Sequence, residues 1–274
     1  MDEVSEFASR FLHGKFATIT LGEDLVYRIP EYLCEKFRAP CPILYRELMV
    51  KMDTNQSTTL CLALDRRTFE LFLFWLSESR LPDLAESIKM VPVQVRENFC
   101  NAHLNILAEL WMFAWAHSIR NLQNEVIISL LEVLSCGTVK PEMLSGYFTS
   151  IEESQLEDVL LLEVAHGLLR GHYTTKEEEH FARLDGFFST FTALTRGEGK
   201  LDPKETSPSI RWNNERDADA FLVSENKPDG GSDEETEDED GGRVRSKAQH
   251  LPEEDIRNRN GVCSRVINIS EKEG

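Results

Sequence analysis

The stretch 14–76 decides the fold of this chain. It opens with Gly14-Lys-Phe-Ala-Thr-Ile-Thr-Leu21, continues with Leu25-Val-Tyr-Arg-Ile-Pro30 and closes with Phe69-Glu-Leu-Phe-Leu-Phe-Trp-Leu76. The first two runs are rich in β-forming residues and flank a short turn, which is typical of a β-hairpin. The last run is apolar on nearly all sides, which predicts a central, buried helix.

The rest of the folded part reads as one more strand and a series of helices. Prolines at 30 and 42 favour helix starts, because proline suits the first helical turn. A third strand is expected over 58–64, and Thr68 is expected to cap the helix that follows it. Further helices are expected over 104–116, 122–134, 141–148, 156–169 and 177–194. The mixed stretch 82–103 is either an insertion or contains a short helix.

These elements predict an α+β fold in which a small three-stranded sheet is capped by a cluster of helices. We expect a first domain over 1–135 and a helical extension packed on it over 136–196. Residues 197–274 are poor in large apolar side chains and rich in acidic ones, so they cannot offset the entropy of ordering the backbone. They are predicted to form a disordered acidic tail.

The net charge limits the classes of partner. The chain of 274 residues carries a net charge of −18 at pH 7. Such a charge argues against nucleic acid, whose binding needs Lys and Arg, and against anionic membranes. No apolar run approaches the roughly 20 residues that span a bilayer, and residues 1–20 do not resemble a signal peptide. We expect the chain in the cytoplasm, the nucleus or both.

No motif for catalysis or cofactor binding stands out. The chain has no Gly-x-Ser-x-Gly elbow, no phosphate-binding Gly-Lys-Ser/Thr loop and no Gly-x-Gly-x-x-Gly fingerprint. His166, His172 and His180 share no helical face, so no metal site is expected. Cys34 and Cys41 are expected to be buried thiols. We therefore expect a non-enzymatic protein without a cofactor.

Aromatic residues are assigned to the core. Trp75, Trp111 and Trp115 lie in apolar helical patterns without interleaved basic residues, so they are not expected to stack on bases. The apolar stripe 181–194 either binds a partner helix or closes the core of the C-terminal helices, and closure is favoured.

Several short segments together resemble a BTB/POZ domain, most closely the divergent type that is abundant in filamentous fungi. The opening 14–21 is similar to the family's Gly-Lys-Phe-Ser-Asp-Val-Thr-Ile, and 69–76 is similar to its Phe-Glu-x-Phe-Leu-x-Trp-Leu helix. Weaker likeness is found in 27–34, 41–44 and 111–124. The resemblance covers about residues 14–170.

The resemblance implies a protein-interaction module that acts as a scaffold or adaptor, through self-association or by binding other proteins. Many family members carry Asp and His near a dimer interface, and Thr18 and Pro30 stand at these places here. The charged dimer pocket is therefore missing from this sequence.

The resemblance also raises the alternative of a substrate adaptor for a cullin-RING ubiquitin ligase. In that case Leu48, Met49, Met52 and Asp53 would face the cullin scaffold. The family's hydrophobic-x-Glu element falls on Met52-Asp53-Thr54, where the glutamate is absent.

A second alternative concerns the acidic run 233–240. The run either keeps the tail solvated or holds a basic partner such as a histone, which would make the chain a chromatin-associated factor. Ser232 and Thr236 each precede an acidic residue by three positions, so both are candidate phosphorylation sites.

Overall fold

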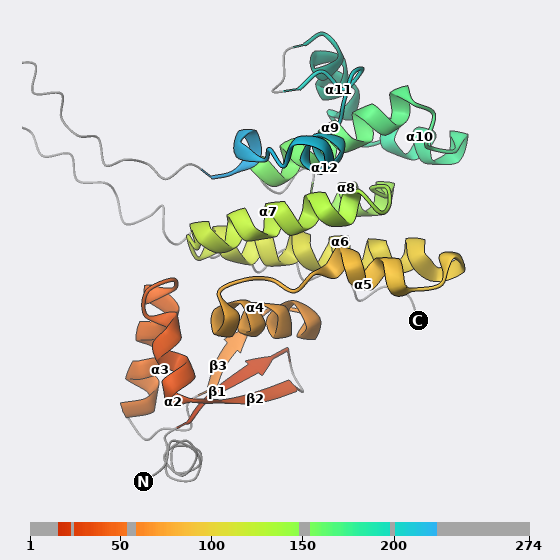
Figure 1. The fold of residues 1–274 in the computed structure, drawn as a ribbon. Coiled ribbons are helices and arrows are strands. Elements are labelled where there is room, and N and C mark those ends of the chain that lie inside the picture. Colours follow the sequence, from red (N-terminus) through yellow and green to blue (C-terminus); the bar gives the residue numbers. More distant parts are fainter. Residues whose placement is uncertain (1–15, 23–24, 54–58, 148–153, 198–200, 224–274) are drawn as a thin grey trace, which may run out of the picture.

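A computed structural model describes residues 16–22, 25–53, 59–147, 154–197 and 201–223. Within these ranges the chain forms three strands and eleven α-helices, which confirms the mixed α+β class (Figure 1). The strands are β1 (Phe16–Leu21), β2 (Leu25–Pro30) and β3 (Thr59–Leu62). The helices are α2 (Glu31–Cys34), α3 (Pro42–Asp53), α4 (Arg66–Glu78), α5 (Leu84–Met90), α6 (Val93–Ala116), α7 (Arg120–Leu134), α8 (Pro141–Tyr147), α9 (Gln155–Leu169), α10 (Thr175–Ala182), α11 (Phe187–Thr195) and α12 (Pro208–Glu215), with 3-10 turns η1 (Glu35–Phe37) and η2 (Asp219–Phe221).

The sheet has the order β2-β1-β3. The predicted hairpin is confirmed, because β1 and β2 pair antiparallel from Phe16↔Pro30 to Leu21↔Leu25. β3 pairs with β1 in parallel, from Thr18↔Thr59 to Leu21↔Leu62. Alternate residues of β1 are buried, as a strand with one face on the core requires: Ala17, Ile19 and Leu21.

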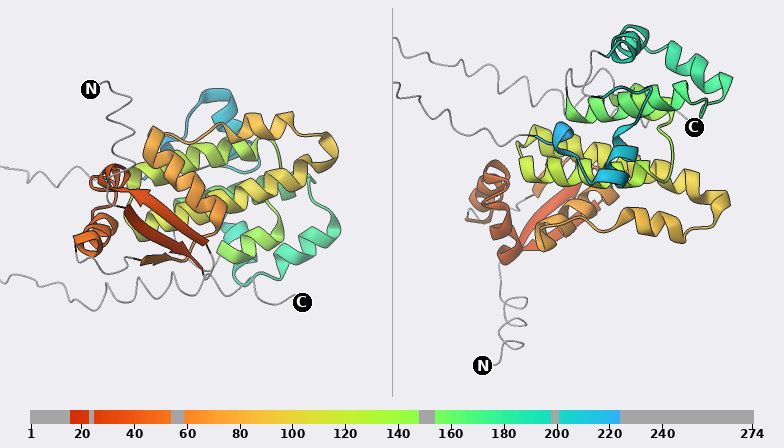
Figure 2. Two further views of the ribbon diagram at one scale, coloured as in Figure 1. Left: turned by 90° about the horizontal axis from the view of Figure 1, so that it is seen from below. Right: turned by 45° about the horizontal axis from the view of Figure 1, so that its top comes forward.

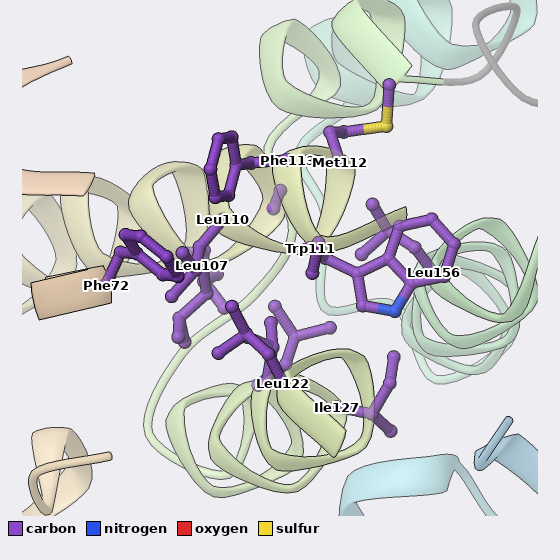
Figure 3. Close-up of a cluster of buried hydrophobic side chains, with 14 of the residues drawn as sticks. Phe72, Leu107, Leu110, Trp111, Met112, Phe113, Leu122, Ile127 and Leu156 are labelled. Atoms are coloured by element: carbon purple, nitrogen blue, oxygen red, sulfur yellow. The ribbon is translucent and has the colours of Figure 1, made fainter. Parts of the chain in front are cut away.

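The antiparallel helices α6 and α7 form the middle of the molecule. The sheet with α2, α3 and α4 lies on one side of this pair, and α8 to α12 lie on the other (Figures 1 and 2). Trp111 of α6 is fully buried, and its indole lies near Ile127 of α7 and Leu156 of α9 (Figure 3). One continuous apolar core therefore joins the strand-containing half to the C-terminal helices.

Helix α4 begins earlier than the sequence predicts. Its N-cap is Asp65, whose carboxylate accepts a hydrogen bond from the Arg67 amide at 2.8 Å. Thr68 therefore lies inside the helix, and the prediction that it is the cap is wrong. Thr68 is buried, and its hydroxyl donates to Glu109 of α6 at 2.5 Å. Glu109 also accepts the backbone N–H of Asp65 at 2.9 Å.

The stretch 82–103 is helical along most of its length. Asp83 caps α5 by accepting the Glu86 amide at 2.7 Å, and α6 starts directly after Pro92. The reading of this stretch as containing a short helix is confirmed. The central helix is also eleven residues longer at its N-terminus than the pattern over 104–116 indicates.

The helix expected over 177–194 is two helices. Helix α10 ends at Ala182, and Gly186, the N-cap of α11, has a φ of 77°, a left-handed conformation that redirects the chain into α11. Phe181 and Phe187 are both buried, and their ring centroids lie 5.6 Å apart. These two phenylalanines close the core, whereas Phe188 is 72% exposed.

Residues 201–223 are folded, so the prediction of a disordered tail from residue 197 is wrong for them. Ser207 caps α12 and Pro208 occupies its first turn. Leu201 and Phe221 are buried against the helices, which provides the apolar burial that average composition did not indicate. The acidic run 233–240, with Ser232 and Thr236, lies outside the described residues.

No helix in the described ranges has both the length and the apolar character that crossing a bilayer requires.

Candidate functional site

Helix α3 presents two different faces. Leu44 and Leu48 are buried and pack toward the sheet, whereas Ile43 is 56% exposed and Arg46 and Glu47 are exposed beside it. We call Ile43, Arg46 and Glu47 the outer face of α3. The helix lies at the edge of the molecule, beside the sheet (Figure 1). The outer face is therefore open to a partner.

The four residues expected to contact a cullin scaffold are placed differently. Leu48 is 0% exposed, so its side chain belongs to the core and the expectation that it faces a partner is corrected. Met49 is partly buried and packs against the core. Met52 and Asp53 belong to the last turn of α3, and their side chains lie outside the described residues.

The two positions that correspond to the family's charged dimer pocket lie on the sheet. Thr18 pairs with Arg28 in the register of β1 and β2, and Pro30 ends β2 as the N-cap of α2. Neither side chain supplies a charge.

The three histidines fall into two groups. The rings of His166 and His172 lie 6.2 Å apart between centroids, because the turn after α9 reverses the chain. The Nδ1 atom of His180 instead lies 3.5 Å from Oε1 of Glu142 in α8. The described residues contain no cluster of three or more His, Cys, Asp or Glu side chains that could hold a metal ion.

A pocket of about 230 Å³ lies between α9, α12 and the loop that joins α7 to α8. We call it the α9–α12 pocket. Its polar lining includes Glu163, His166, His172, Ser207 and Ser209. Its apolar lining includes Leu134, Val139, Tyr173 and Ile210.

Among the described residues, Glu163 is the only carboxylate that lines this pocket, and neither Lys nor Arg lines it. Its Oε1 accepts the backbone N–H of Ser209 at 2.5 Å, at the start of α12. Burial raises the pKa of Glu163, and hydrogen bonds from Ser209 and Ser207 oppose that rise. The carboxylate thus anchors α12 to α9 in a poorly solvated place.

His166 has a defined tautomer. Its side chain is 5% exposed, and Nδ1 lies 2.8 Å from the carbonyl oxygen of Pro203. Because a carbonyl oxygen can only accept, Nδ1 carries the hydrogen and the neutral ring keeps its lone pair on Nε2. The imidazole therefore offers an acceptor in addition to the Glu163 carboxylate.

Sequence reasoning did not find this pocket, because part of its wall (Ser207, Ser209, Ile210 and Asn213) comes from residues 201–223, which were expected to be disordered. A local signal was present: serine followed by proline at 207–208 is a typical helix start.

No protein-family model matches the chain, and neither a curated protein nor a solved structure matches it.

Proposed function

We propose that this chain is a non-enzymatic protein-interaction module of the BTB/POZ type, which acts as a scaffold or adaptor. The order of elements supports this proposal: a hairpin, the helices α2 and α3, the strand β3 and then the apolar helix α4. This is the order in which the sequence segments that resemble the family occur.

The observation that carries the proposal is the outer face of α3. Ile43 provides an exposed apolar side chain one helical turn before the charged Arg46 and Glu47. Protein interfaces commonly combine an apolar centre with a polar rim. The opposite face of α3 is held on the sheet, so the helix presents this surface in a fixed orientation.

The proposal is tested with the tagged full chain and two matched variants. Ile43→Glu places a charge on the outer face, and Met90→Glu places the same charge at an exposed site outside it. Bound proteins are identified by quantitative mass spectrometry, and self-association is measured by sedimentation. We expect Ile43→Glu to reduce a bound partner or the dimer at least tenfold, and Met90→Glu to leave both unchanged.

The identity of what is lost separates the two forms of the proposal. Loss of a cullin with its RING subunit supports a ubiquitin-ligase adaptor, and loss of the dimer supports self-association. If Ile43→Glu and Met90→Glu retain the same partners and sediment alike, the outer face of α3 is not the binding surface and the proposal fails. The chromatin alternative depends on residues outside the described ranges.

A further inference from the structure

We propose that the α9–α12 pocket binds a small organic cation, namely a primary ammonium group that carries a short apolar chain.

The charge of the pocket favours a cation. The part of the chain that the structure describes gives the lining one carboxylate, Glu163, and no Lys or Arg that could hold an anion. The ring of His166 offers a second acceptor at Nε2. The hydroxyls of Ser207 and Ser209 are already bonded to Glu163 and to each other. An ammonium group has three donors and no acceptor, so it matches this set of acceptors.

An ammonium ligand would also stabilise the charged form of Glu163. Burial disfavours the charged form of Glu163, and the hydrogen bonds that reach it come from neutral groups of α12. A positive charge within a few ångströms compensates for the lost solvation more strongly than a neutral donor does. A metal ion fits less well, because the described residues provide no group of three ligands.

The apolar wall sets the size and shape of the rest of the ligand. Leu134, Val139 and Ile210 form this wall together with the ring of Tyr173, which can also attract a cation. The volume of about 230 Å³ exceeds the roughly 150 Å³ cavity that admits benzene, and it falls below the roughly 300 Å³ at which drug-sized sites begin. A chain of a few carbon atoms fits these limits.

The alternative is that the pocket is only a gap in the packing of residues 201–223 and is filled with water. In that case Glu163 serves solely to cap α12. The two possibilities differ in ligand selectivity. A pocket that only holds water should not bind an ammonium ion more tightly than an alcohol of the same length.

The test uses three probes of equal length on the full chain: n-butylammonium, n-butanol and butyrate. Binding is measured by calorimetry and by NMR of the imidazole protons, at pH 8 and constant ionic strength. We expect saturable binding of n-butylammonium and at least tenfold weaker binding of the other two. Glu163→Gln should weaken n-butylammonium binding at least tenfold. Glu178→Gln, the same change at an exposed glutamate of α10, should leave it unchanged.

The proposal fails if n-butanol binds as well as n-butylammonium, or if Glu163→Gln has no effect on binding. The Glu178→Gln control tests for general attraction of cations to the acidic chain, since both variants replace one glutamate with glutamine. The comparison of the three probes on the unaltered chain remains decisive even if Glu163→Gln releases α12.

Discussion

Gly167 lies where helix α9 passes the ring of Tyr173. A Cβ added at this position would lie 2.6 Å from Cε2 of Tyr173, closer than real contacts allow. Gly146 of α8 offers a comparison, because a Cβ there would meet nothing within 4 Å. A helical glycine is normally unfavourable, so a lack of space explains the first glycine but not the second.

These two glycines give opposite predictions. Gly167→Ala should lower the free energy of unfolding by about 1–3 kcal/mol, because Tyr173 must move. Gly146→Ala should raise it by about 0.5–1 kcal/mol, because the alanine restricts only the unfolded chain. Urea unfolding of both variants checks this. Equal effects at the two sites would show that the contact with Tyr173 is unimportant.

The cysteines are predicted to differ in reactivity. Burial raises the pKa of Cys34 to about 11 and the pKa values of Cys41 and Cys100 to about 12. The thiolate is the reactive form, so these three should resist iodoacetamide at pH 8 while the exposed Cys61 is alkylated. Peptide mapping before and after unfolding measures the difference. Rapid labelling of Cys41 in the native chain would contradict its buried position.

Some of these residue environments could be predicted and others were misread. Cys34 and Cys41 were expected to be buried thiols that act as small apolar residues, and the structure confirms their burial. Leu48 was expected at the surface, although it lies four residues after Leu44 and therefore on the same helical face. Two apolar residues at that spacing indicate a face toward the core, and this signal was available in the sequence.

Among the elements, Lys140 connects three that are distant in the sequence. It precedes α8, forms an ion pair with Glu97 of α6 and approaches Glu177 of α10 at 2.8 Å. Glu177 also forms a capping box with Thr174 at the start of α10. Together these interactions lower the pKa of Glu177 to about 2.

This lowered pKa predicts a loss of stability in acid. Since the pKa of Glu177 in the folded chain lies below the ordinary glutamate value of 4.5, its contribution to stability is complete above pH 4.5 and declines as the pH falls toward 2. Glu177→Gln keeps the capping box but removes the charge. Between pH 5 and pH 3 the free energy of unfolding of the unaltered chain should fall by about 1 kcal/mol more than that of this variant. This figure takes into account that Glu177 is partly exposed to solvent.

Urea unfolding at several pH values measures this difference, and Glu178→Gln provides the control. That variant should retain the acid sensitivity of the unaltered chain. If Glu177→Gln does so as well, the link through Lys140 contributes little.

The predicted elements were correct where local pattern decides them. Turn residues and alternation indicated the hairpin, and apolar periodicity indicated α7 and α9. The break at Gly186 was missed, because Phe181, Leu184, Phe187 and Phe191 continue at helical spacing across it. Apolar periodicity indicates which side chains face the core, but it does not indicate that the helix is interrupted between them.

At the scale of the whole molecule, residues 201–223 close over α7 and α9. Polar contacts hold much of this segment, including those from His166 to Pro203 and from Glu163 to Ser209. Such contacts join residues far apart in the sequence, so composition could not reveal them. Near the end of the segment, the aromatic side chain of Phe221 is fully buried.

We predict that Phe221 holds this segment in place. Phe221→Ala should increase amide hydrogen exchange at least tenfold over 201–223 while α6 and α7 remain protected, because the lost burial is local. Ile210→Ala serves as the control, since this side chain of the same segment is substantially exposed. An equal increase in both variants, or one that spreads through α6, would show that the segment does not open independently.

Two residues after Phe221, the backbone of Val223 is hydrogen-bonded to α7. Asn124 of α7 donates to the carbonyl oxygen of Val223 at 3.2 Å and accepts its N–H at 2.7 Å. Tension applied to the chain beyond Val223 therefore reaches α7 through one amide side chain before it reaches Phe221. In an optical trap that pulls on the C-terminus, Asn124→Ala should lower the force of the first rupture. Under such a load, Asn124 holds the end of residues 201–223 against the α6–α7 pair.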